Sequence, residues 1–527
     1  MLHHDLLLHA PVDDDRHASR TDAERLLRHR ETPYADALER FVAREPVQLM
    51  VPGHGGDGRG MSGRLADFIG ERALRFDVPM LLDDVDLGSD SPFEQALALA
   101  ADAWGARRTW FVTNGASQAN RTVALAVRGL GRHVLCQRSA HSSFSDGILV
   151  GGLLPSFVFP SVDRRHGISH GVSPEALELA LAEAEREGRA ASAVYIVSPS
   201  YFGATADVRA LADVAHAHGA PLIVDGAWGP HFGFHPDLPE SPVRLGADLV
   251  VSSTHKLAGS LTQSAMLHLG HGPFAERLEP LVERAFTLTA STSTSALLRA
   301  SLDIARHALV TGEEYIGASI AAADDFREAL RRDPRFDVLS DGFGAYDDIA
   351  AVDPLRVPID VSATGVDAHW LRDRMAADHG IYFEMSTATT LVALIGAGKV
   401  PDLDLVHRAL VDAVDAVGSA AAGGTAHGGD GRPAAACDFP ELPSSGALRI
   451  APREAFFRET EVVPAADAVG RVSADTLAAY PPGIPNIIPG EEITAEGVAF
   501  LRAVAASPTG YVRGAVNEDV SSFRVVR

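Results

Sequence analysis

Lysine is rare in this chain, and one of its two lysines lies where reactive chemistry is expected. Among the 46 basic residues only Lys256 and Lys399 are lysines, and the other 44 are arginines. Arginine stays protonated in proteins, whereas a lysine amine can lose its proton and form an imine with an aldehyde. Lys256 ends the segment DLVVSSTHK (residues 248–256), whose apolar run is typical of a buried strand. We therefore predict that Lys256 is a reactive amine at the end of a strand.

An aspartate follows a second apolar run and indicates the chemistry that the lysine serves. Asp225 lies in PLIVDGAWG (residues 221–229), 31 residues before Lys256. A lysine at one strand end and an aspartate at another suit pyridoxal phosphate. The lysine binds the aldehyde of this cofactor, and the aspartate keeps the pyridine nitrogen protonated, so that the ring accepts electrons from the substrate.

The phosphate of such a cofactor requires backbone N–H groups at the start of a helix, together with hydroxyl groups. The segment TNGASQAN (residues 113–120) fits this requirement, because Gly115 lets the chain turn and the next residues open a helix. Ala116, Ser117 and Gln118 are the residues of that first turn. We expect the phosphate to bind there.

Each of these residues also has a purely structural interpretation. Lys256 could be an exposed lysine in a chain whose coding bias favours arginine, and Asp225 could cap a turn. His141 in RSAHSS could be a structural histidine, and Lys399 in GAGKVPD fits a solvated loop between a strand and a helix. The ordered set of lysine, aspartate and helix start is more specific than any one of its members.

The segments around these residues alternate between apolar runs of strand length and amphipathic runs of helix length. This alternation predicts an α/β fold with a mostly parallel central sheet and helices on both faces. Ligands of such sheets bind beyond the carboxyl ends of the strands, where the polar residues above lie. The expected strands are residues 109–115, 133–139, 192–200, 221–229 and 248–256, and the expected helices are residues 33–43, 93–105, 116–129, 174–187 and 208–218.

The pattern changes near residue 301, where we expect one helix over residues 301–330 to lead into a smaller α+β domain. The expected elements of that domain are strands at 355–362 and 389–398 and helices at 368–379 and 403–417. The predicted boundaries are a flexible N-terminal arm at 1–30, a large cofactor-binding α/β domain at 31–300, the small domain at 301–418, a low-complexity linker at 419–440 and a C-terminal domain at 441–527.

Composition excludes several classes of protein. The chain has 70 acidic against 46 basic residues, and its net charge of −24 argues against a surface for nucleic acid or anionic lipid. No apolar run is long enough to span a membrane, and the acidic N-terminus does not resemble a signal peptide. The two cysteines, Cys136 and Cys437, define neither a disulfide framework nor a metal cluster. We expect a cytoplasmic protein without a bound metal.

Motifs along most of the chain resemble the ornithine/lysine/arginine decarboxylases of pyridoxal-phosphate fold type I. The most specific are STHKLAGSLTQSAMLHL (253–269), VDGAWGPHFGFHP (224–236) before it, and AAYPPGIPNIIPGE (478–491). VPGHGGDGRG and PREAFF match as well, so that the resemblance covers about residues 32–492. The resemblance is to the compact form of the family, and we therefore expect a chain without the large N-terminal wing domain of some members.

The resemblance implies a role for each matched residue. The expected catalytic residues are Lys256, which binds the cofactor aldehyde, Asp225, which pairs with the pyridine nitrogen, and His141, which stacks on the ring. The residues expected to hold the phosphate are Ala116, Ser117, Gln118, Ser253 and His255, and the candidates for contact with the substrate are Glu384 and Trp228. The resemblance also implies a homodimer or higher homo-oligomer, in which STSTS (291–295) reaches the site of the neighbouring subunit.

Four departures from the family pattern fall around the expected substrate. One lysine of the pattern is replaced by Gly55 in PGHGGD, and another is replaced by Ser142 in the segment His141-Ser142-Ser143. The aromatic residue of the family's SPSY segment is Ala296 here, and the aspartate of its E-L-x-D pattern is Thr387. The cofactor residues are thus intact, whereas the surroundings of the substrate differ.

These motifs predict decarboxylation of a basic amino acid (arginine, lysine or ornithine) to the corresponding amine and carbon dioxide. The substrate amine displaces Lys256, and the bond to the carboxylate breaks while it is perpendicular to the cofactor ring. The acidic segment LLDDVDLGSDSP, with Asp83, Asp84 and Asp86, is either a further contact for a basic substrate or a solvated loop. The departures leave open transamination, elimination or oxidation instead. A non-catalytic relative is a third alternative, which the intact Lys256 and Asp225 disfavour.

Overall fold

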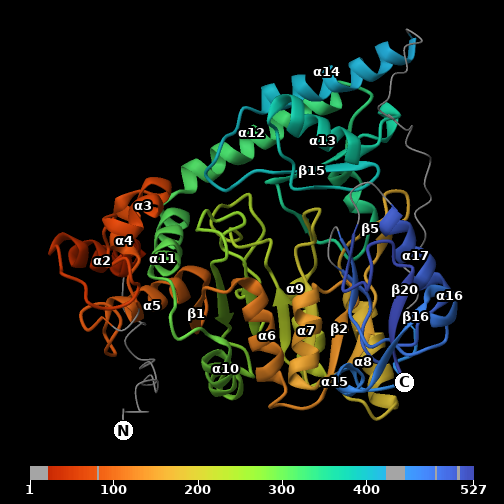
Figure 1. Ribbon diagram of the computed structural model, residues 1–527, viewed down its shortest axis with the longest axis horizontal. Helices are drawn as coiled ribbons and strands as arrows, with labels where there is room; N and C mark the ends of the chain where they lie inside the picture. The colour runs from red at the N-terminus through yellow and green to blue at the C-terminus, as the bar shows by residue number, and fades with distance from the viewer. Residues whose placement is uncertain (1–21, 80–81, 423–445, 481–483, 507–510) are drawn as a thin grey trace.

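The computed structural model describes residues 22–79, 82–422, 446–480, 484–506 and 511–527. A seven-stranded sheet with helices on both faces forms the centre of the molecule (Figure 1). The N-terminal helices lie at one edge of this body, the C-terminal domain lies at the other, and a smaller domain lies across one end. Within these described ranges, no helix is long and apolar enough to cross a membrane.

One strand of the central sheet runs against the others. The strands are β1 (Arg108–Val112), β2 (His133–Gln137), β3 (Leu154–Val158), β6 (Val194–Val197), β8 (Leu222–Asp225), β9 (Leu249–Ser252) and β10 (Ala265–Leu269). Their order is β1-β10-β9-β8-β6-β2-β3, in which β10 is antiparallel to both of its neighbours and the strands from β9 to β3 pair in parallel. The mostly parallel sheet is confirmed. Neither β3 nor β10 is among the strands expected from the sequence. Strand β10 follows β9 and the Lys256 turn without an intervening helix, so the alternation of strands and helices gives no signal for it.

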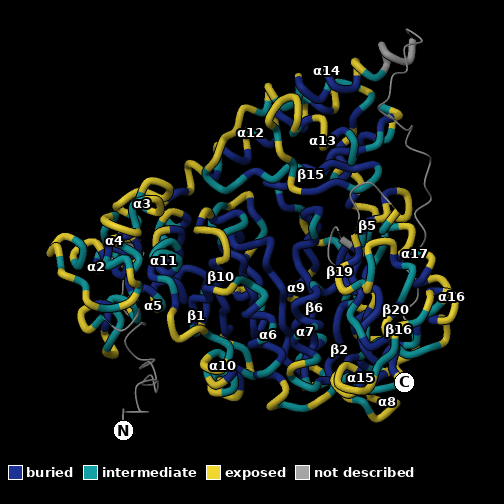
Figure 2. Tube along the Cα trace, in the orientation of Figure 1, coloured by how far each residue is buried: buried dark blue, intermediate teal, exposed yellow. Residues whose placement is uncertain are grey.

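Helices cover both faces of the sheet, because alternate strand residues point to opposite faces and are apolar on both. The covering helices are α6 (Gly115–Val127), α7 (Ser142–Gly151) and α10 (Ala275–Thr289) on one face, and α8 (Pro174–Arg186) and α9 (Val208–Ala217) on the other. Val134, Cys136 and Tyr195 pack against the first group, and Leu135 and Val194 pack against the second. Figure 2 shows the resulting core as buried segments along the central strands.

Capping residues in the sequence set the helix boundaries. The Ser173 hydroxyl accepts the N–H of Ala176 at 3.1 Å where α8 begins, and Asp207 accepts the N–H of Ala210 at 3.0 Å where α9 begins. Gly105 ends α5 (Pro92–Trp104) with a φ of 74°, a left-handed conformation that glycine adopts at little cost. The expected ends of these helices therefore agree with the structure to within a residue or two.

Short helices precede the first strand. They are α1 (Asp22–His29), α2 (Pro33–Ala43), η2 (Gly60–Ser62), α3 (Gly63–Ile69), α4 (Glu71–Phe76) and α5. Arg306 donates to the carbonyl oxygens of His29 and Glu31 at 2.7 and 2.6 Å and holds the end of α1 against the body. Residues 22–29 of the predicted arm are therefore a packed helix, while residues 1–21 lie outside the described part of the chain.

The smaller domain is a four-stranded antiparallel sheet with helices. Its sheet has the order β11-β13-β15-β14, made of β11 (Asp337–Val338), β13 (Arg356–Asp360), β14 (Met385–Ser386) and β15 (Thr390–Leu394). Its other elements are η3 (Leu339–Ala345), η4 (Ser362–Thr364), α12 (Glu313–Arg331), α13 (Ala368–His379) and α14 (Leu403–Ala422). The last residues of α14 include 419–422 of the predicted linker, and residues 423–440 of that linker lie outside the described ranges.

The helix expected over residues 301–330 is in fact two helices. α11 (Ala296–Thr311) ends at Gly312, and α12 begins at the next residue. A side chain at position 312 would place its Cβ 2.3 Å from the Ala308 carbonyl oxygen, so the break depends on glycine. The apolar periodicity continues through this point, which is why the sequence pattern indicates a single helix.

Two small elements fasten the smaller domain to the central body. β12 (Ala351–Val352) pairs with β7 (Ala204–Thr205), and the hairpin of β4 (Val162–Asp163) and β5 (Ile168–Ser169) lies beside β13. In that hairpin the two ring nitrogens of His166 lie 2.8 Å from Asp163 and 3.0 Å from Asp360 of β13. These bonds raise the pKa of His166 against the opposing effect of burial.

The C-terminal domain packs on the central body beside β2 and α7. It comprises α15 (Pro452–Phe457), β16 (Thr460–Pro464), α16 (Ala465–Ala468), β17 (Leu477–Tyr480), β18 (Ile484–Ile487), α17 (Ala495–Ala506), β19 (Tyr511–Arg513) and β20 (Ser522–Val526). Arg138, just after β2, donates to Glu491 at 3.1 Å and to the Asn486 carbonyl oxygen at 2.7 Å. Burial raises the pKa of Glu491, and the charge of Arg138 opposes this shift.

Replacing Arg138 by alanine is expected to destabilise the protein by about 3–5 kcal/mol, because the Glu491 carboxylate then stays buried without its partner. Side chains in this pair are only 10% and 2% exposed. The matched control is Arg471, whose pair with Glu461 is 36% and 38% exposed, and Arg471→Ala is expected to lose much less stability than Arg138→Ala. Urea unfolding followed by circular dichroism measures both variants. Equal losses would contradict the expectation.

Candidate active site

The predicted lysine and aspartate lie at the carboxyl ends of adjacent parallel strands. Asp225 is the last residue of β8 and lies in register with Val251 of β9. Lys256 follows β9 after a tight turn, in which its N–H donates to the Ser253 carbonyl oxygen at 2.9 Å. Two residues that are distant in sequence thus meet at one edge of the sheet, as the topology of parallel strands requires.

The amine of Lys256 lies over the indole ring of Trp228, with Nζ 3.4 Å from the ring centre. Burial lowers the pKa of this amine to about 7. Asp225 and Glu384 oppose the shift, and the positive charge of Arg356 reinforces it. Near neutral pH a large fraction of the amine is therefore uncharged, as attack on an aldehyde carbonyl requires.

Three donors orient the carboxylate of Asp225. The Tyr195 hydroxyl donates to Oδ2 at 2.7 Å, the side-chain amide of Asn120 donates to the same oxygen at 3.1 Å, and the N–H of Ala227 donates to Oδ1 at 3.1 Å. The Tyr195 ring stacks on Phe144 with 3.6 Å between ring centres. These hydrogen bonds hold the buried carboxylate in one orientation.

Hydrogen bonds connect Asp225 to His141. The Asn120 amide donates also to Ser143 Oγ at 3.0 Å, and this hydroxyl lies 2.8 Å from Nδ1 of His141. The N–H of Ser143 donates to the same nitrogen, so Nδ1 is an acceptor and the proton of the neutral ring is on Nε2. Burial lowers the pKa of His141; Asp225 opposes this shift and Lys256 adds to it.

Asn120 and Tyr195 are positioning residues that the sequence motifs did not single out. Asn120 lies within TNGASQAN, directly after the residues expected at the phosphate, and Tyr195 lies within an apolar strand segment. Both are buried. A polar side chain on the buried face of a helix and a tyrosine inside an apolar strand both require a partner, and this requirement is the signal that could have identified them.

The start of α6 has the features expected of a phosphate site. Gly115 adopts a φ of 74°, and Asn114 provides no side-chain cap, so that backbone N–H groups of the first turn remain for a ligand. Ala116 and Ser117 are half-buried in this turn. Gln118 is 4% exposed, and neither polar atom of its side chain has a partner within the described residues. A buried amide without partners fits a site that a polar ligand completes.

The turn after β9 supplies further polar groups. Ser253 and Thr254 are buried, and the Thr254 hydroxyl has no partner in the part of the chain that the structure describes. His255 donates from Nδ1 to the Ser264 carbonyl oxygen at 2.9 Å, since a carbonyl oxygen can only accept. Neutral His255 therefore has no proton on Nε2, and it can donate from this atom to a phosphate only as an imidazolium. Burial lowers the pKa of His255, whereas a bound phosphate would raise it.

The two substrate candidates have different surroundings near Lys256. Trp228 is buried and contacts both Lys256 and Arg356, whose guanidinium carbon lies 4.3 Å from the ring centre. Glu384 is exposed, and its charge acts on both Lys256 and Arg356. Arg356 is a site residue that the sequence motifs missed. It is fully buried, and its Nε and Nη2 have no partner among the described residues.

The acidic segment after residue 81 is engaged in ion pairs. Asp86 pairs with Arg299 at 3.0 Å in a buried contact, and Asp84 pairs with Arg44 at 2.9 Å on the surface. Asp84 fits the solvated-loop interpretation, whereas the buried Asp86 does not; a contact of this segment with a basic substrate stays a prediction. Ser295, the last residue of STSTS, caps α11 through the N–H of Leu298, and the expected reach of this segment into a neighbouring site stays a prediction.

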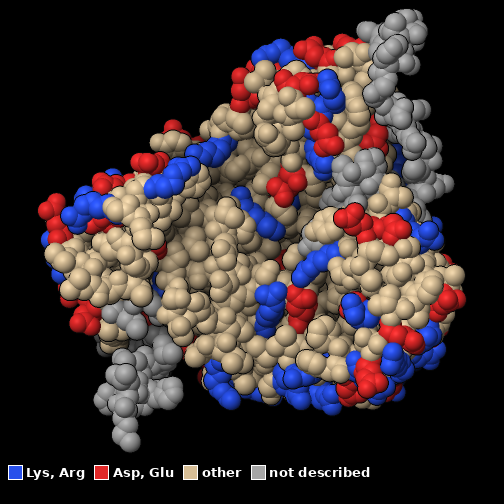
Figure 3. All heavy atoms as spheres, viewed as in Figure 1, with Lys and Arg blue, Asp and Glu red and all other residues tan. Residues whose placement is uncertain are grey.

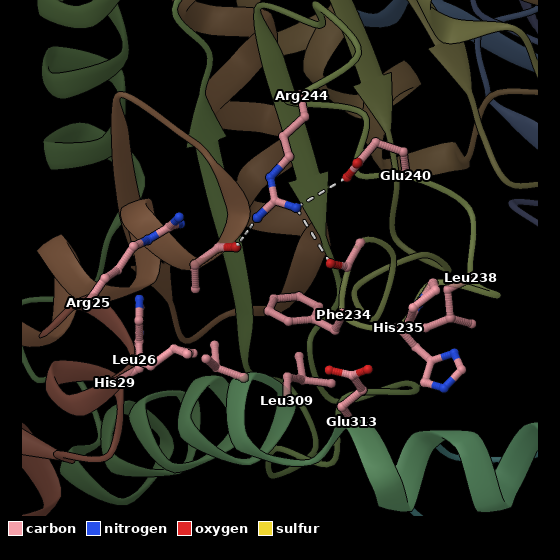
Figure 4. Close-up of a pocket in the computed structure, with 14 residues that line it drawn as sticks. Arg25, Leu26, His29, Phe234, His235, Leu238, Glu240, Arg244, Leu309 and Glu313 are labelled. Carbon is pink, nitrogen blue, oxygen red and sulfur yellow. Dashed lines mark hydrogen bonds and ion pairs between the residues drawn. The ribbon is translucent and has the colours of Figure 1, made fainter. Parts of the chain in front are cut away.

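A recess near the smaller domain and a separate cavity near the N-terminal helices are candidates for a binding site. Figure 3 shows a recess between the smaller domain and the central body, with acidic and basic side chains at its edges. A cavity of about 620 Å³ lies elsewhere, between α1, α11 and the loop of residues 233–240 (Figure 4). Its arginines already have partners, since Arg25 pairs with Asp102 at 3.0 Å and Arg244 pairs with Glu240 at 3.3 Å. None of the predicted site residues lines this cavity.

Comparisons with known proteins give a consistent result. The family model described as "Orn/Lys/Arg decarboxylase, major domain" matches residues 32–346, and that described as "Orn/Lys/Arg decarboxylase, C-terminal domain" matches residues 445–510. An arginine decarboxylase of Halalkalibacterium halodurans is 35% identical over 516 residues, which are 95% of this chain and 98% of the relative. An arginine decarboxylase of Bacillus subtilis is 34% identical over 89% of this chain and 93% of the relative.

A solved structure shares the fold. Lysine decarboxylase A from Pseudomonas aeruginosa superposes with a TM-score of 0.77 over 96% of this chain and 82% of that one. The sequence identity is 22%, so this likeness establishes the fold alone. It agrees with the predicted fold type I architecture of a central sheet and a smaller domain.

The amine of Lys256 is expected to undergo reductive methylation by formaldehyde and cyanoborohydride with a pH midpoint of about 7, because burial disfavours its charged form. The experiment uses protein freed of cofactor. Since the chain has two lysines, peptide mass spectrometry distinguishes Lys256 from the exposed Lys399, which is the internal control. A midpoint for Lys256 near 10.5, the ordinary lysine value, would contradict the expectation.

Proposed function

We propose that this chain, which belongs to the Orn/Lys/Arg decarboxylase family, removes the α-carboxylate of arginine with pyridoxal phosphate as its cofactor. Membership of the family makes the chain an amino-acid decarboxylase for a basic substrate. The choice of arginine is supported by the two relatives named arginine decarboxylase, which match over nearly their whole length. The observation that carries the cofactor assignment is the partly neutral amine of Lys256 beside Asp225.

The residues at the site fit the three groups of pyridoxal phosphate. The amine of Lys256 suits its aldehyde, and the oriented carboxylate of Asp225 suits its pyridinium nitrogen. The first turn of α6 suits its phosphate, as does the amide of Gln118, which has no partner among the residues that the structure describes. When bound, the cofactor supplies an aldehyde that takes up the substrate amine and a ring that accepts the electrons released with carbon dioxide.

The side chains around the cofactor then have separate tasks. Tyr195 and Asn120 hold Asp225 in one orientation, so that its negative charge keeps a proton on the ring nitrogen. Lys256 Nζ, whose pKa burial lowers to about 7, can hold a proton and deliver it to the α-carbon of the substrate. Trp228 covers this amine and excludes water from it.

One observation favours a different reaction on the same amino acid. Arg356 is a buried cation close to Trp228 and Lys256, and two of its nitrogens, Nε and Nη2, have no partner among the described residues. A carboxylate bound by this guanidinium would be stabilised before it could leave, and the substrate would keep it. Transamination or oxidation would then replace decarboxylation. The departures at Ser142, Ala296 and Thr387, which the resemblance places around the substrate, agree with this alternative.

Assays of arginine, lysine and ornithine decide between these reactions. Arginine labelled at the carboxyl carbon is expected to release labelled carbon dioxide and leave the corresponding amine, faster than lysine or ornithine. Lys256→Ala is expected to lower the rate by about 10²–10⁴-fold or more, because it removes both the covalent anchor and the proton donor. Release of a keto acid or peroxide without carbon dioxide would overturn the proposal.

The exposed carboxylate of Glu384 is proposed to meet the cationic end of the substrate. Glu384→Gln is expected to raise KM for arginine about fivefold with little change in kcat, as the loss of about 1 kcal/mol from a partly exposed ion pair predicts. Glu314→Gln, which removes an exposed carboxylate of α12, is the matched control and leaves KM unchanged. A fall in kcat at constant KM would show that Glu384 acts on the reaction rather than on binding.

A further inference from the structure

An arginine of the C-terminal domain contacts the helix that begins at His141. Arg513, at the end of β19, donates from Nη1 to the Ser142 hydroxyl at 2.5 Å, and its Nη2 lies 3.6 Å from Asp146. Ser142 is 1% exposed, whereas the Arg513 side chain is 45% exposed. The guanidinium therefore approaches from the surface and covers a buried hydroxyl in the first turn of α7.

The first turn of α7 is the part of the fold that fixes His141. His141 is the N-cap of α7, and its Nδ1 accepts bonds from Ser143. Ser143 connects in turn to Asn120, which also holds Asp225. A displacement of this turn would therefore move His141 relative to Asp225, and both residues belong to the proposed cofactor site.

Position 142 is also where the sequence departs from the family pattern, which has a lysine between the histidine and a serine. The side chain of residue 142 faces the guanidinium of Arg513, with hydroxyl and nitrogen in hydrogen-bond contact. A lysine at this position would extend toward the space that the guanidinium occupies. A lysine at position 142 and the guanidinium of Arg513 would repel each other at this distance, so we expect only one of the two cations to occupy this place.

We propose that Arg513 is a positioning residue for His141, and that its guanidinium supplies from the C-terminal domain the positive charge that the family pattern has at position 142. This inference rests on the proposed function only in taking His141 as part of the cofactor site. It gives the C-terminal domain a task in the site besides packing, since one of its side chains orders the turn on which His141 depends.

The charges around His141 determine whether loss of the Arg513 guanidinium raises or lowers the pKa of this histidine. Burial lowers the pKa of His141, and the positive charges of Lys256 and Arg513 act in the same direction. The negative charges of Asp225 and Asp146 act against it, and Asp146 is itself paired with Arg121 at 3.0 Å on α6. Removing the guanidinium therefore raises the pKa of His141, and the ring becomes protonated at a higher pH.

The test measures His141 directly in the full-length protein. Hydrogen–deuterium exchange at the imidazole C2 atom, read by mass spectrometry of the His141 peptide across pH, gives the titration midpoint without substrate or cofactor. Arg513→Ala is expected to raise this midpoint, and Arg513→Lys is expected to leave it near the original value. The control is Arg524→Ala, since Arg524 is on the same domain, is 44% exposed and pairs with Asp475 at 3.1 Å. This variant leaves the midpoint unchanged.

A second variant relocates the charge. Ser142→Lys in the Arg513→Ala background is expected to restore the His141 midpoint, because it returns a positive charge to the place that the guanidinium occupied. An unchanged midpoint in Arg513→Ala overturns the proposal, as does a raised midpoint that Ser142→Lys does not restore. Because the exchange experiment needs no turnover, it is independent of whether arginine is the substrate.

Discussion

Transfer from water to a buried site costs more free energy for a charged amine than for a neutral one. The buried surroundings of Lys256 therefore favour its neutral form. Lys256 is buried beyond the end of β9, and this burial lowers the pKa of its amine from 10.5 to about 7. An arginine at this position would stay charged, which accounts for a lysine in a chain that otherwise uses arginine. The cofactor assignment, the proposed reaction and the roles of the neighbouring side chains all depend on this one neutral amine.

The remaining charges at the site are arranged around that amine. The negative charge of Asp225 favours the protonated form of the Lys256 amine. Hydrogen bonds from Tyr195 and Asn120 hold the Asp225 carboxylate in one orientation. Arg356 favours the neutral form and comes from the smaller domain, which β12 fastens to the central body through β7. The electrostatics of the site therefore depend on how three parts of the chain are joined. The central sheet supplies the reactive residues, and the smaller and C-terminal domains supply the cations beside them.

Much of the fold and the centre of the site could be predicted because their signals are local. Apolar runs followed by Asp225 and Lys256 indicate strand ends, and Ser173 and Gly105 set helix boundaries over a few residues. Arg356 gives no such signal, because its partners lie far away in the sequence and its burial depends on tertiary packing. The reversed strand β10 was missed for a related reason, since its pairing with β1 joins distant segments.

Some predictions about the site concern a second subunit, and others concern the bound cofactor. The homodimer expected from the resemblance, and the reach of residues 291–295 into a neighbouring site, both concern a second subunit. The roles of Ala116, Ser117, Gln118, Ser253 and His255 at the phosphate likewise depend on the bound cofactor. The side chain of Gln118, which has no partner in the described part of the chain, supports this placement, and the tautomer of His255 limits how that residue can take part.

The most direct test of the central claim is to trap the covalent bond between the protein and its cofactor. The purified protein is incubated with pyridoxal phosphate, reduced with borohydride, digested and mapped by mass spectrometry. The account predicts that the phosphopyridoxyl group is found on Lys256, that Lys399 is unmodified, and that the visible absorbance of the complex disappears on reduction. A protein that takes up no cofactor, or one that carries the label on Lys399 alone, would contradict the assignment of Lys256 as the reactive amine.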